Sequence, residues 1–393
     1  MIYFFILSFI LIGIFLYDIR NCRTKRVEYY YFIFMLLSLL SGFSYRLGAD
    51  TISYMNEYKS YSDNVLILSF NYIFSFAETD RMPLWILLNT IFRMFHADFW
   101  VFHLFQSIVI NYAVCFIFHK YSNCSFVALL LYYIVIFPYF NFEILRESFS
   151  VAIFLFLVPS LLAKSYFKYY IGILFALGFH ISASVLFFVP FMEIISRQKF
   201  GFVIFVIIIV VILFCSQYFT ESLLLLLNID LYADKALGYF TNTKYSLSKL
   251  NVSFVVNILF FIVLPYVLYA FSYKKREYKN LSLFPLVGMY TLIYAATLIV
   301  PIFYRLNNYF IIFFIICISG MWKGWHFERI SISVVKFIGR FLLLCFLLFK
   351  LSLYWLPLYP TIYPSYSRYY PYESVIYKHT DPIRERIFFN LDK

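Results

Sequence analysis

The stretch CSFVALLLYYIVIFPYFNFEILRESFSVAIFLFLVPSLLA, residues 124–163, contains two apolar runs with a short charged loop between them. The runs cover 124–140 and 147–163, and each is long enough for one membrane crossing of about 17–25 residues. Apolar segments cross a bilayer as helices, because every backbone polar group must be hydrogen-bonded within the protein. The stretch therefore predicts two membrane-spanning helices with a charged turn at one surface.

The same pattern fills most of the 393-residue chain. Hydrophobic residues make up 63% and charged residues 13%, against about 25% charged residues in soluble proteins. The composition excludes a soluble class and predicts an all-α, polytopic transmembrane bundle of about 11–13 spans. Further apolar runs cover 1–18, 28–45, 99–118, 200–219, 252–272, 281–303, 306–322 and 333–356.

Two regions do not fit single spans. Residues 83–95 are short for a crossing and contain Arg93, so we expect a re-entrant or interfacial helix. Residues 169–196 would form one helix of about 42 Å against a hydrocarbon core of about 30 Å. We expect two short helices there, with a turn near His180.

The basic residues predict the orientation and explain the net charge of +12. Lys and Arg gather in short loops such as 20–26 and 274–279, as they do on the cytoplasmic side of membrane proteins, and not in a nucleic-acid-binding stripe. This places the outer loops 46–82 and 221–250 and the tail 357–393 outside; a 13-span alternative stays open. The first 17 residues lack a basic start and a small-residue cleavage site, which indicates an uncleaved span with its N-terminus outside.

We therefore expect residues 1–356 to form a single transmembrane domain. The Tyr- and Pro-rich tail 357–393 would follow it on the periplasmic side. Its tyrosines fit two roles: an aromatic belt at the outer interface, or a stacking surface for sugar rings.

Ionisable residues near membrane depth are costly and usually functional, and five clusters of polar residues map to the predicted outer face. The first contains Arg46 and Asp50, followed by Tyr54 and Tyr58. A helix that starts near Asp50 would place Asp50 and both tyrosines on one face. The alternative is an Arg–Asp pair that only closes a loop.

The second and third clusters precede apolar runs. Glu78 lies just before Pro83, where an acid also suits an ordinary helix start. Asn141 and Arg146 belong to the charged loop of the opening stretch, and a guanidinium at the outer end of a helix can hold a phosphate through two hydrogen bonds. Snorkelling of Arg146 to the interface is the alternative.

The fourth cluster is centred on His180, whose ordinary pKa suits proton transfer at neutral pH. A hydrogen-bonded core histidine is the alternative. The fifth contains Arg305 and Tyr309 between two apolar runs, and Arg305 is a candidate second phosphate ligand or a snorkelling residue.

No nucleotide-binding or metal-binding motif is present in the sequence, and the six cysteines form no CxxC pair. We expect no cofactor and no metal. The clusters together suit a polyanionic headgroup such as a pyrophosphate.

At these same residues the chain resembles the EpsG-type, Wzy-like family of bacterial polysaccharide polymerases. The resemblance runs in order over nearly the whole length, and its departures are Glu147, where such proteins often have Gln, and the residues after Glu78, where a glycine often follows. The matching pieces are Arg46 to Asp50 with Tyr54 and Tyr58, Glu78, Asn141 to Arg146, Phe179 to Ala183 after Tyr166–Tyr170, and Arg305 to Phe310.

The resemblance implies a GT-C-like glycosyltransferase of the inner membrane with its active site facing the periplasm. Its substrates would be oligosaccharide repeat units on undecaprenyl pyrophosphate, and its product O-antigen, capsule or exopolysaccharide. The reaction would need no nucleotide and no metal, because the pyrophosphate leaving group supplies the energy. Expected partners are a chain-length regulator and a flippase.

The bottom-up residues fit this chemistry. Arg146, Arg305 and Arg46 would hold the donor pyrophosphate, His180 or Asp50 would accept the proton of the attacking hydroxyl, and tyrosines would stack on sugars. Two other classes stay open: a flippase for lipid-linked oligosaccharide, whose loss would leave repeat units inside, and a membrane O-acyltransferase, whose loss would change acetyl content but not chain length.

Overall fold

The computed structural model describes residues 2–64, 81–192, 257–265, 283–298, 303–322, 332–357 and 362–391. Within these ranges the chain is helical, with two isolated β-bridges and no strand. Ile2–Ile19, Phe99–Tyr121 and Leu145–Leu162 are each long and apolar enough to cross a membrane, and several shorter apolar helices accompany them. The prediction of an all-α membrane bundle is confirmed.

The chain forms two compact units. Unit 1 comprises Met1–Val158, Ile171–Ile181 and Ser319–Lys393, and unit 2 comprises Pro159–Tyr170 and Ser182–Ile318. The C-terminal tail thus belongs to unit 1. The apolar run 200–219, the outer loop 221–250 and Glu78 lie outside the described residues.

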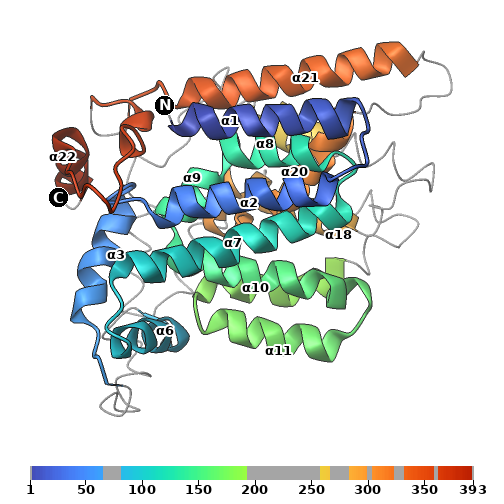
Figure 1. Ribbon diagram of the computed structural model, residues 1–393. Helices are drawn as coiled ribbons and strands as arrows, with labels where there is room; N and C mark the ends of the chain where they lie inside the picture. The colour runs from blue at the N-terminus through green and yellow to red at the C-terminus, as the bar shows by residue number, and fades with distance from the viewer. Residues whose placement is uncertain are drawn as a thin grey trace. The chain divides into compact units, whose positions relative to one another are not determined.

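Apolar helices packed along one another build unit 1 (Figure 1). Gly13 lets α1 approach closely, since a Cβ there would lie 2.5 Å from the Phe126 ring. Tyr17 stacks on the same ring at 5.0 Å, and the Tyr30 hydroxyl donates to the Cys115 carbonyl. The helices are α1 (Ile2–Gly13), extended by a π-helical segment to Ile19, α2 (Arg26–Gly42), α7 (Phe99–Tyr121), α8 (Ser125–Val135), most of α10 (Leu145–Leu162) and α21 (Ile332–Leu353).

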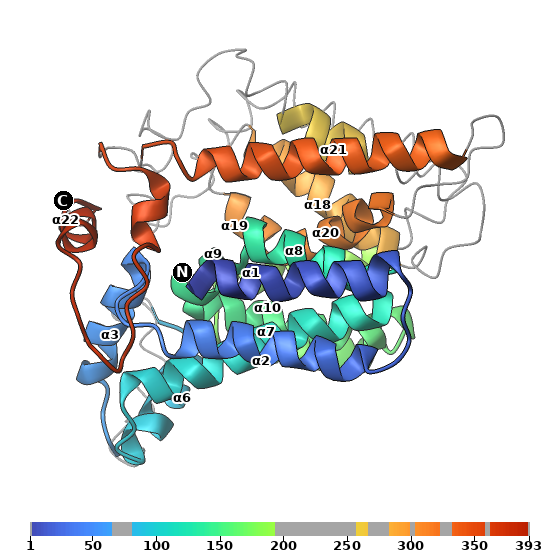
Figure 2. The same cartoon turned by 45° about the horizontal axis from the view of Figure 1, so that its top comes forward.

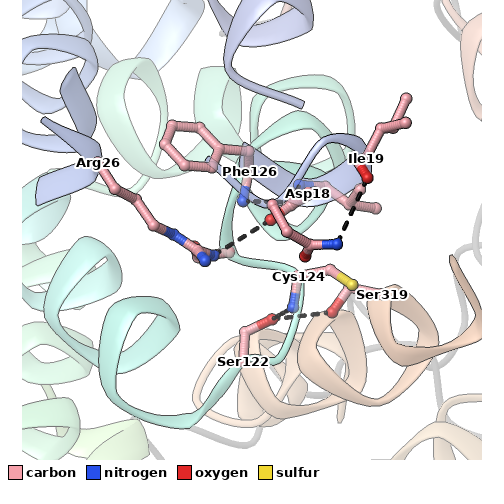
Figure 3. A network of polar contacts seen from close by, with 10 residues as sticks. Asp18, Ile19, Arg26, Ser122, Cys124, Phe126 and Ser319 are labelled. Carbon is pink, nitrogen blue, oxygen red and sulfur yellow. Dashed lines mark hydrogen bonds and ion pairs between the residues drawn. The ribbon is translucent and has the colours of Figure 1, made fainter. Parts of the chain in front are cut away.

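A polar network around Asp18 holds one end of unit 1 together (Figure 3). Asp18 is buried, and its Oδ2 accepts hydrogen bonds from the backbone N–H groups of Phe126 and Val127 at 3.0 and 2.9 Å. These N–H groups lie in the first turn of α8, where a carboxylate satisfies unpaired donors and complements the helix dipole. Arg26 donates to Asp18 Oδ1 at 3.3 Å. Asp18 thereby joins the α1–α2 connection to the start of α8.

The α7–α8 connection lies at this same end. The Ser122 hydroxyl is 3.2 Å from the Ser319 hydroxyl and also accepts the backbone N–H of Cys124 (Figure 3). The basic loop 20–26 and Lys120 therefore share one end of unit 1, as expected of loops on one side of a membrane.

The other end of unit 1 carries short elements and the tail (Figure 2). The tail packs against the end of α2 through main-chain bonds. The backbone N–H of Tyr45 donates to the Glu373 carbonyl at 2.8 Å, and the backbone N–H of Val375 donates to the Phe43 carbonyl at 3.0 Å. The Tyr3 hydroxyl donates to the Tyr369 carbonyl at 2.7 Å. The short elements are α3 (Ala49–Ser60), α6 (Pro83–Met94), α9 (Phe137–Phe142), a 3₁₀ turn (Ser365–Arg368) and α22 (Pro382–Leu391).

Two ambiguous regions form short helices, as expected, and the run 124–140 is interrupted. α6 is a 12-residue helix that begins at Pro83, and α11 (Tyr166–Leu177) is followed by a second short helical element from Ile181, with His180 in the turn. The run 124–140 is not one helix but breaks at Ile136 into α8 and α9. Pro138 explains the break, because proline has no N–H to donate to the Ile134 carbonyl four residues earlier, which accepts from the Tyr354 hydroxyl instead.

Unit 2 also packs through apolar and aromatic residues. The Tyr169 hydroxyl donates to the Leu186 carbonyl at 2.7 Å, which holds the two arms of the hairpin after α10 together. Phe261 stacks on Tyr294, and Phe314 stacks on Tyr290, in both cases with ring centroids 4.6 Å apart. The described helices are α18 (Phe284–Thr297), α19 (Tyr304–Asn307) and α20 (Ile311–Ser319).

Candidate functional site

An aromatic cluster at the tail end of unit 1 brings three of the predicted residue groups together. It draws on α3, α6, the start of α7, the start of α10 and the turn after α11. The end of α7 lies in the network of Figure 3, so a 23-residue helix of about 34 Å separates the aromatic cluster from the basic loops. The members are Tyr54, Tyr58, Tyr61, Trp85, Ile86, Phe102, Leu145, Phe149 and Phe179.

Arg146 lies in the first turn of α10, as predicted, and contacts Tyr54. Its Nε donates to the Tyr54 hydroxyl at 3.4 Å, and its guanidinium carbon lies 5.8 Å from the centre of the Tyr54 ring. Tyr54 packs edge-on against Trp85 at 5.5 Å. Burial raises the pKa of Tyr54 although the charge of Arg146 opposes the shift, so the phenol stays neutral. The half-buried guanidinium is thus held over a rigid aromatic base.

Asp50 occupies the first turn of α3 and is exposed. Its backbone N–H donates to Glu143 Oε2 at 3.3 Å. The Thr51 hydroxyl donates to the Phe142 carbonyl, and a Cβ on Gly48, whose φ is +77°, would lie 2.5 Å from that oxygen. These contacts therefore fix the start of α3 against the charged loop 141–147.

Glu143 has no assigned role in the sequence analysis, yet it connects three segments. Its side chain is 4% exposed, and its Oε1 accepts bonds from Arg368 Nη1 at 3.3 Å and from the Tyr369 hydroxyl at 3.2 Å. The signal that could identify Glu143 is its place in a short, charge-rich loop between apolar runs. Its partners in the tail leave no comparable sequence signal.

A second carboxylate, Glu57, anchors α3 to α6 and is also missed by the sequence analysis. Arg81 donates two hydrogen bonds to it, at 2.8 and 2.7 Å, and Trp85 Nε1 donates at 3.2 Å. The Tyr61 hydroxyl donates as well. Burial raises the pKa of Glu57, but the hydrogen bonds from Arg81, Tyr61 and Trp85 outweigh it, so the pKa lies below its ordinary value.

The turn that contains His180 packs on α10 and α6. The Ser150 hydroxyl donates to the Ala176 carbonyl at 2.7 Å, and Phe179 stacks on Phe149 with centroids 5.3 Å apart. The backbone N–H of Leu84 donates to the Gly178 carbonyl at 2.8 Å. His180 itself is half-buried at the end of α10 that carries Arg146. These contacts place the turn with His180 beside the aromatic cluster. His180 and Asp50 are both still candidate bases.

Arg46 is paired with a carboxylate of the tail. Its guanidinium makes two hydrogen bonds of 2.6 Å to Glu385 in α22, and its backbone carbonyl accepts from Arg384. The loop-closing partner of Arg46 is therefore Glu385 and not Asp50. This pair ties Arg46 to the tail, and a role of Arg46 in substrate binding stays a prediction.

Three candidate substrate-binding residues are buried and hydrogen-bonded within the protein. The Tyr58 ring is 2% exposed and its hydroxyl donates to Ala97 O, while the fully buried Asn141 exchanges side-chain bonds with Asn111 and Tyr132. In unit 2, the buried Tyr309 hydroxyl lies 2.9 Å from the Ser182 hydroxyl. These bonds hold the three side chains in place within the protein, and their roles in substrate binding stay predictions.

Arg305 lies in α19 of unit 2 and is half-buried. Its Nε lies 3.5 Å from the Tyr304 hydroxyl. The Ser182–Tyr309 contact joins the fourth and fifth predicted clusters within this unit. That Arg305 acts together with Arg146 stays a prediction.

The fold is a helical membrane bundle, and arginine, aspartate and histidine lie with aromatic residues near one end of unit 1. This arrangement defines the class: a multi-span membrane protein with a polar site near one end of its helices. The model of the EpsG family matches residues 27–374, so the chain belongs to the EpsG family. No curated protein and no solved structure matches the chain. Membership in this family confirms the resemblance and indicates a polysaccharide polymerase-like role in a membrane.

Proposed function

We propose that this protein is a glycosyltransferase that joins oligosaccharide repeat units carried on undecaprenyl pyrophosphate, at the periplasmic face of the bacterial inner membrane. One observation carries the proposal. Asp50, Arg146 and the turn with His180 lie around one aromatic cluster, at the end of unit 1 away from its basic loops.

The reaction forms one glycosidic bond and breaks one glycosyl phosphate bond. A hydroxyl oxygen of the terminal sugar on one lipid-linked unit bonds to the anomeric carbon of the chain on another carrier. The bond from that carbon to the pyrophosphate oxygen breaks, and the pyrophosphate leaves with the electron pair. The hydroxyl proton passes to Asp50 or His180, the two candidate bases.

Arg146 supplies charge where the leaving group develops it. A guanidinium fixed over Tyr54 needs little rearrangement to bind a phosphate oxygen, and such preorganised donors are the largest source of stabilisation for developing negative charge. Arg305 is the second arginine of the proposal. Arg46 is not needed for the leaving group, since it pairs with Glu385.

The test is elongation by the purified protein in lipid nanodiscs, given lipid-linked repeat units and no nucleotide. We expect polymers of increasing length on a gel. Arg146→Ala should abolish them, and so should one of Asp50→Asn and His180→Ala, namely the variant that removes the base. Arg20→Gln is the control, because Arg20 is exposed at the basic end of unit 1. If the wild-type protein moves repeat units across the bilayer but never joins them, the protein is a transporter and the proposal is wrong.

A further inference from the structure

Among the described residues, three Arg–Glu pairs lie at the tail end of unit 1, and one of them is unlike the others. Arg46 binds Glu385 through two contacts of 2.6 Å, and Arg81 binds Glu57 through contacts of 2.8 and 2.7 Å. Both pairs have the planar two-bond geometry that uses a guanidinium fully. Arg368 makes a single contact with Glu143, at 3.3 Å.

The single contact leaves donors on Arg368 for another group. Its Nε is buried and has no hydrogen-bond partner among the described residues. A buried N–H without an acceptor costs about 1–3 kcal/mol, and native proteins rarely keep such groups without a use. The side chain is 24% exposed, so the guanidinium is sheltered but not sealed off from a ligand.

The tail is also held by bonds that do not involve the Arg368 side chain. Main-chain bonds attach the tail at the residue itself and five residues after it, from Gly48 N to the Arg368 carbonyl at 2.9 Å and from Tyr45 N to the Glu373 carbonyl at 2.8 Å. The Tyr3 hydroxyl adds a bond to the Tyr369 carbonyl. A side chain needed only as an anchor would be redundant beside these contacts.

The position of Arg368 links it to the candidate site. Glu143, which holds its guanidinium, also holds the backbone N–H of Asp50. Burial lowers the pKa of Arg368, but the electrostatic interactions with Glu143, Tyr369 and Asp50 outweigh this effect. The pKa of Arg368 therefore lies above its ordinary value, and the side chain remains a cation. Arg146 contacts Tyr54, which lies one helical turn after Asp50 in α3.

We infer that Arg368 is a phosphate-binding residue of this site, which receives the pyrophosphate group of a prenyl-linked substrate through the donors that Glu143 leaves unused. The inference rests on the proposed function and adds to it a residue from the C-terminal tail. Glu143 orients the guanidinium, and the main-chain bonds of the tail fix its position.

The experiment measures binding of farnesyl pyrophosphate to the full-length protein in nanodiscs by calorimetry. We expect Arg368→Gln to weaken binding about tenfold to a hundredfold, the range for a lost hydrogen bond to a charged group, and Arg368→Lys to weaken it less. Arg20→Gln should bind like the wild-type protein. Inorganic pyrophosphate and farnesol are measured with the wild-type protein as comparison ligands. If both bind more weakly than farnesyl pyrophosphate, the ligand of the site is a prenyl-linked pyrophosphate. If inorganic pyrophosphate binds as tightly as farnesyl pyrophosphate, the ligand is the free anion.

A cross-link separates ligand binding from tail anchoring. Ser44 and Ser374 form an isolated β-bridge, so Ser44→Cys with Ser374→Cys should form a disulfide. The inference holds if Arg368→Gln weakens binding while this disulfide still forms. It is overturned if binding is unchanged, or if the disulfide is lost together with binding, because Arg368 is then an anchor. If Arg368-dependent binding is present but no elongation occurs, the proposed polymerase function fails and this inference stands.

Discussion

The carboxylate of Glu143 accepts a hydrogen bond of 3.3 Å from the backbone N–H of Asp50, which lies 93 residues away in the chain, at the start of α3. The buried carboxylate acts as a helix cap supplied from outside the helix, because that N–H belongs to the first turn of α3. The position of Asp50, a candidate base, therefore depends on Glu143.

Glu143→Ala should lower both stability and elongation. The change leaves Arg368, Tyr369 and the Asp50 N–H without their shared acceptor, which we expect to cost about 1–3 kcal/mol. Glu143→Gln keeps an acceptor and should lose less of each. Thermal unfolding and the elongation rate measure the two effects; wild-type elongation by folded Glu143→Ala would show that Asp50 does not depend on this carboxylate.

Arg146→Ala should reduce kcat about a hundredfold or more, the usual effect of removing a donor that stabilises developing negative charge. The melting temperature should change little, because the guanidinium is half-buried. Tyr54→Phe is the matched control: it removes only the 3.4 Å contact and leaves the ring beneath the guanidinium. Elongation kinetics with both variants decide the matter, and a normal kcat for Arg146→Ala would remove this residue from the mechanism.

Asn141→Ala should destabilise the protein without raising KM. Asn141 is fully buried and bonded to Asn111 and Tyr132, so its loss leaves buried polar groups unpaired at a cost of about 1–3 kcal/mol. The melting temperature should fall, and the folded fraction should keep its affinity for the lipid-linked substrate. A raised KM with an unchanged melting temperature would instead support the predicted role of Asn141 in substrate binding.

Local sequence patterns were sufficient where the cause was local. The length of the run 169–196 forced a turn near His180, and Pro83 marked the start of α6. The break in the run 124–140 also had a local cause, Pro138, but the apolar composition around it favoured one continuous span.

The contacts that complete the site were out of reach of such patterns. Arg46 meets Glu385 over 339 residues of sequence, and Glu143 meets Arg368 over 225. No periodicity relates such positions, and a tail rich in tyrosine and proline resembles an interfacial belt in composition whether or not it folds back. Only the packed structure distinguishes Arg368 from an ordinary surface arginine.

Glu57→Gln should make stability less dependent on pH in the acid range. The hydrogen bonds from Arg81, Tyr61 and Trp85 hold the pKa of Glu57 below its ordinary value of 4.5, so the folded state favours the carboxylate. Its contribution is complete above pH 4.5 and is lost as the pH falls from there through the lower pKa of the folded state. Melting temperatures between pH 7 and pH 3 should show the wild-type advantage over Glu57→Gln shrinking with acid; a constant difference would contradict the role of this carboxylate.

Thiol labelling of intact cells should separate the two ends of unit 1. Cys22 lies in the basic loop and Tyr377 in the tail, 83% exposed, so a membrane-impermeant maleimide should label Tyr377→Cys, while Cys22 should react only after permeabilisation. A Cys22→Ser parent provides the background for each introduced thiol. Tyr304→Cys extends the test to unit 2, since Tyr304 is exposed and adjoins Arg305. The two-arginine proposal requires position 304 to label like position 377; if it behaves like Cys22, Arg305 faces the cytoplasm and Arg146 must act with Arg368 instead.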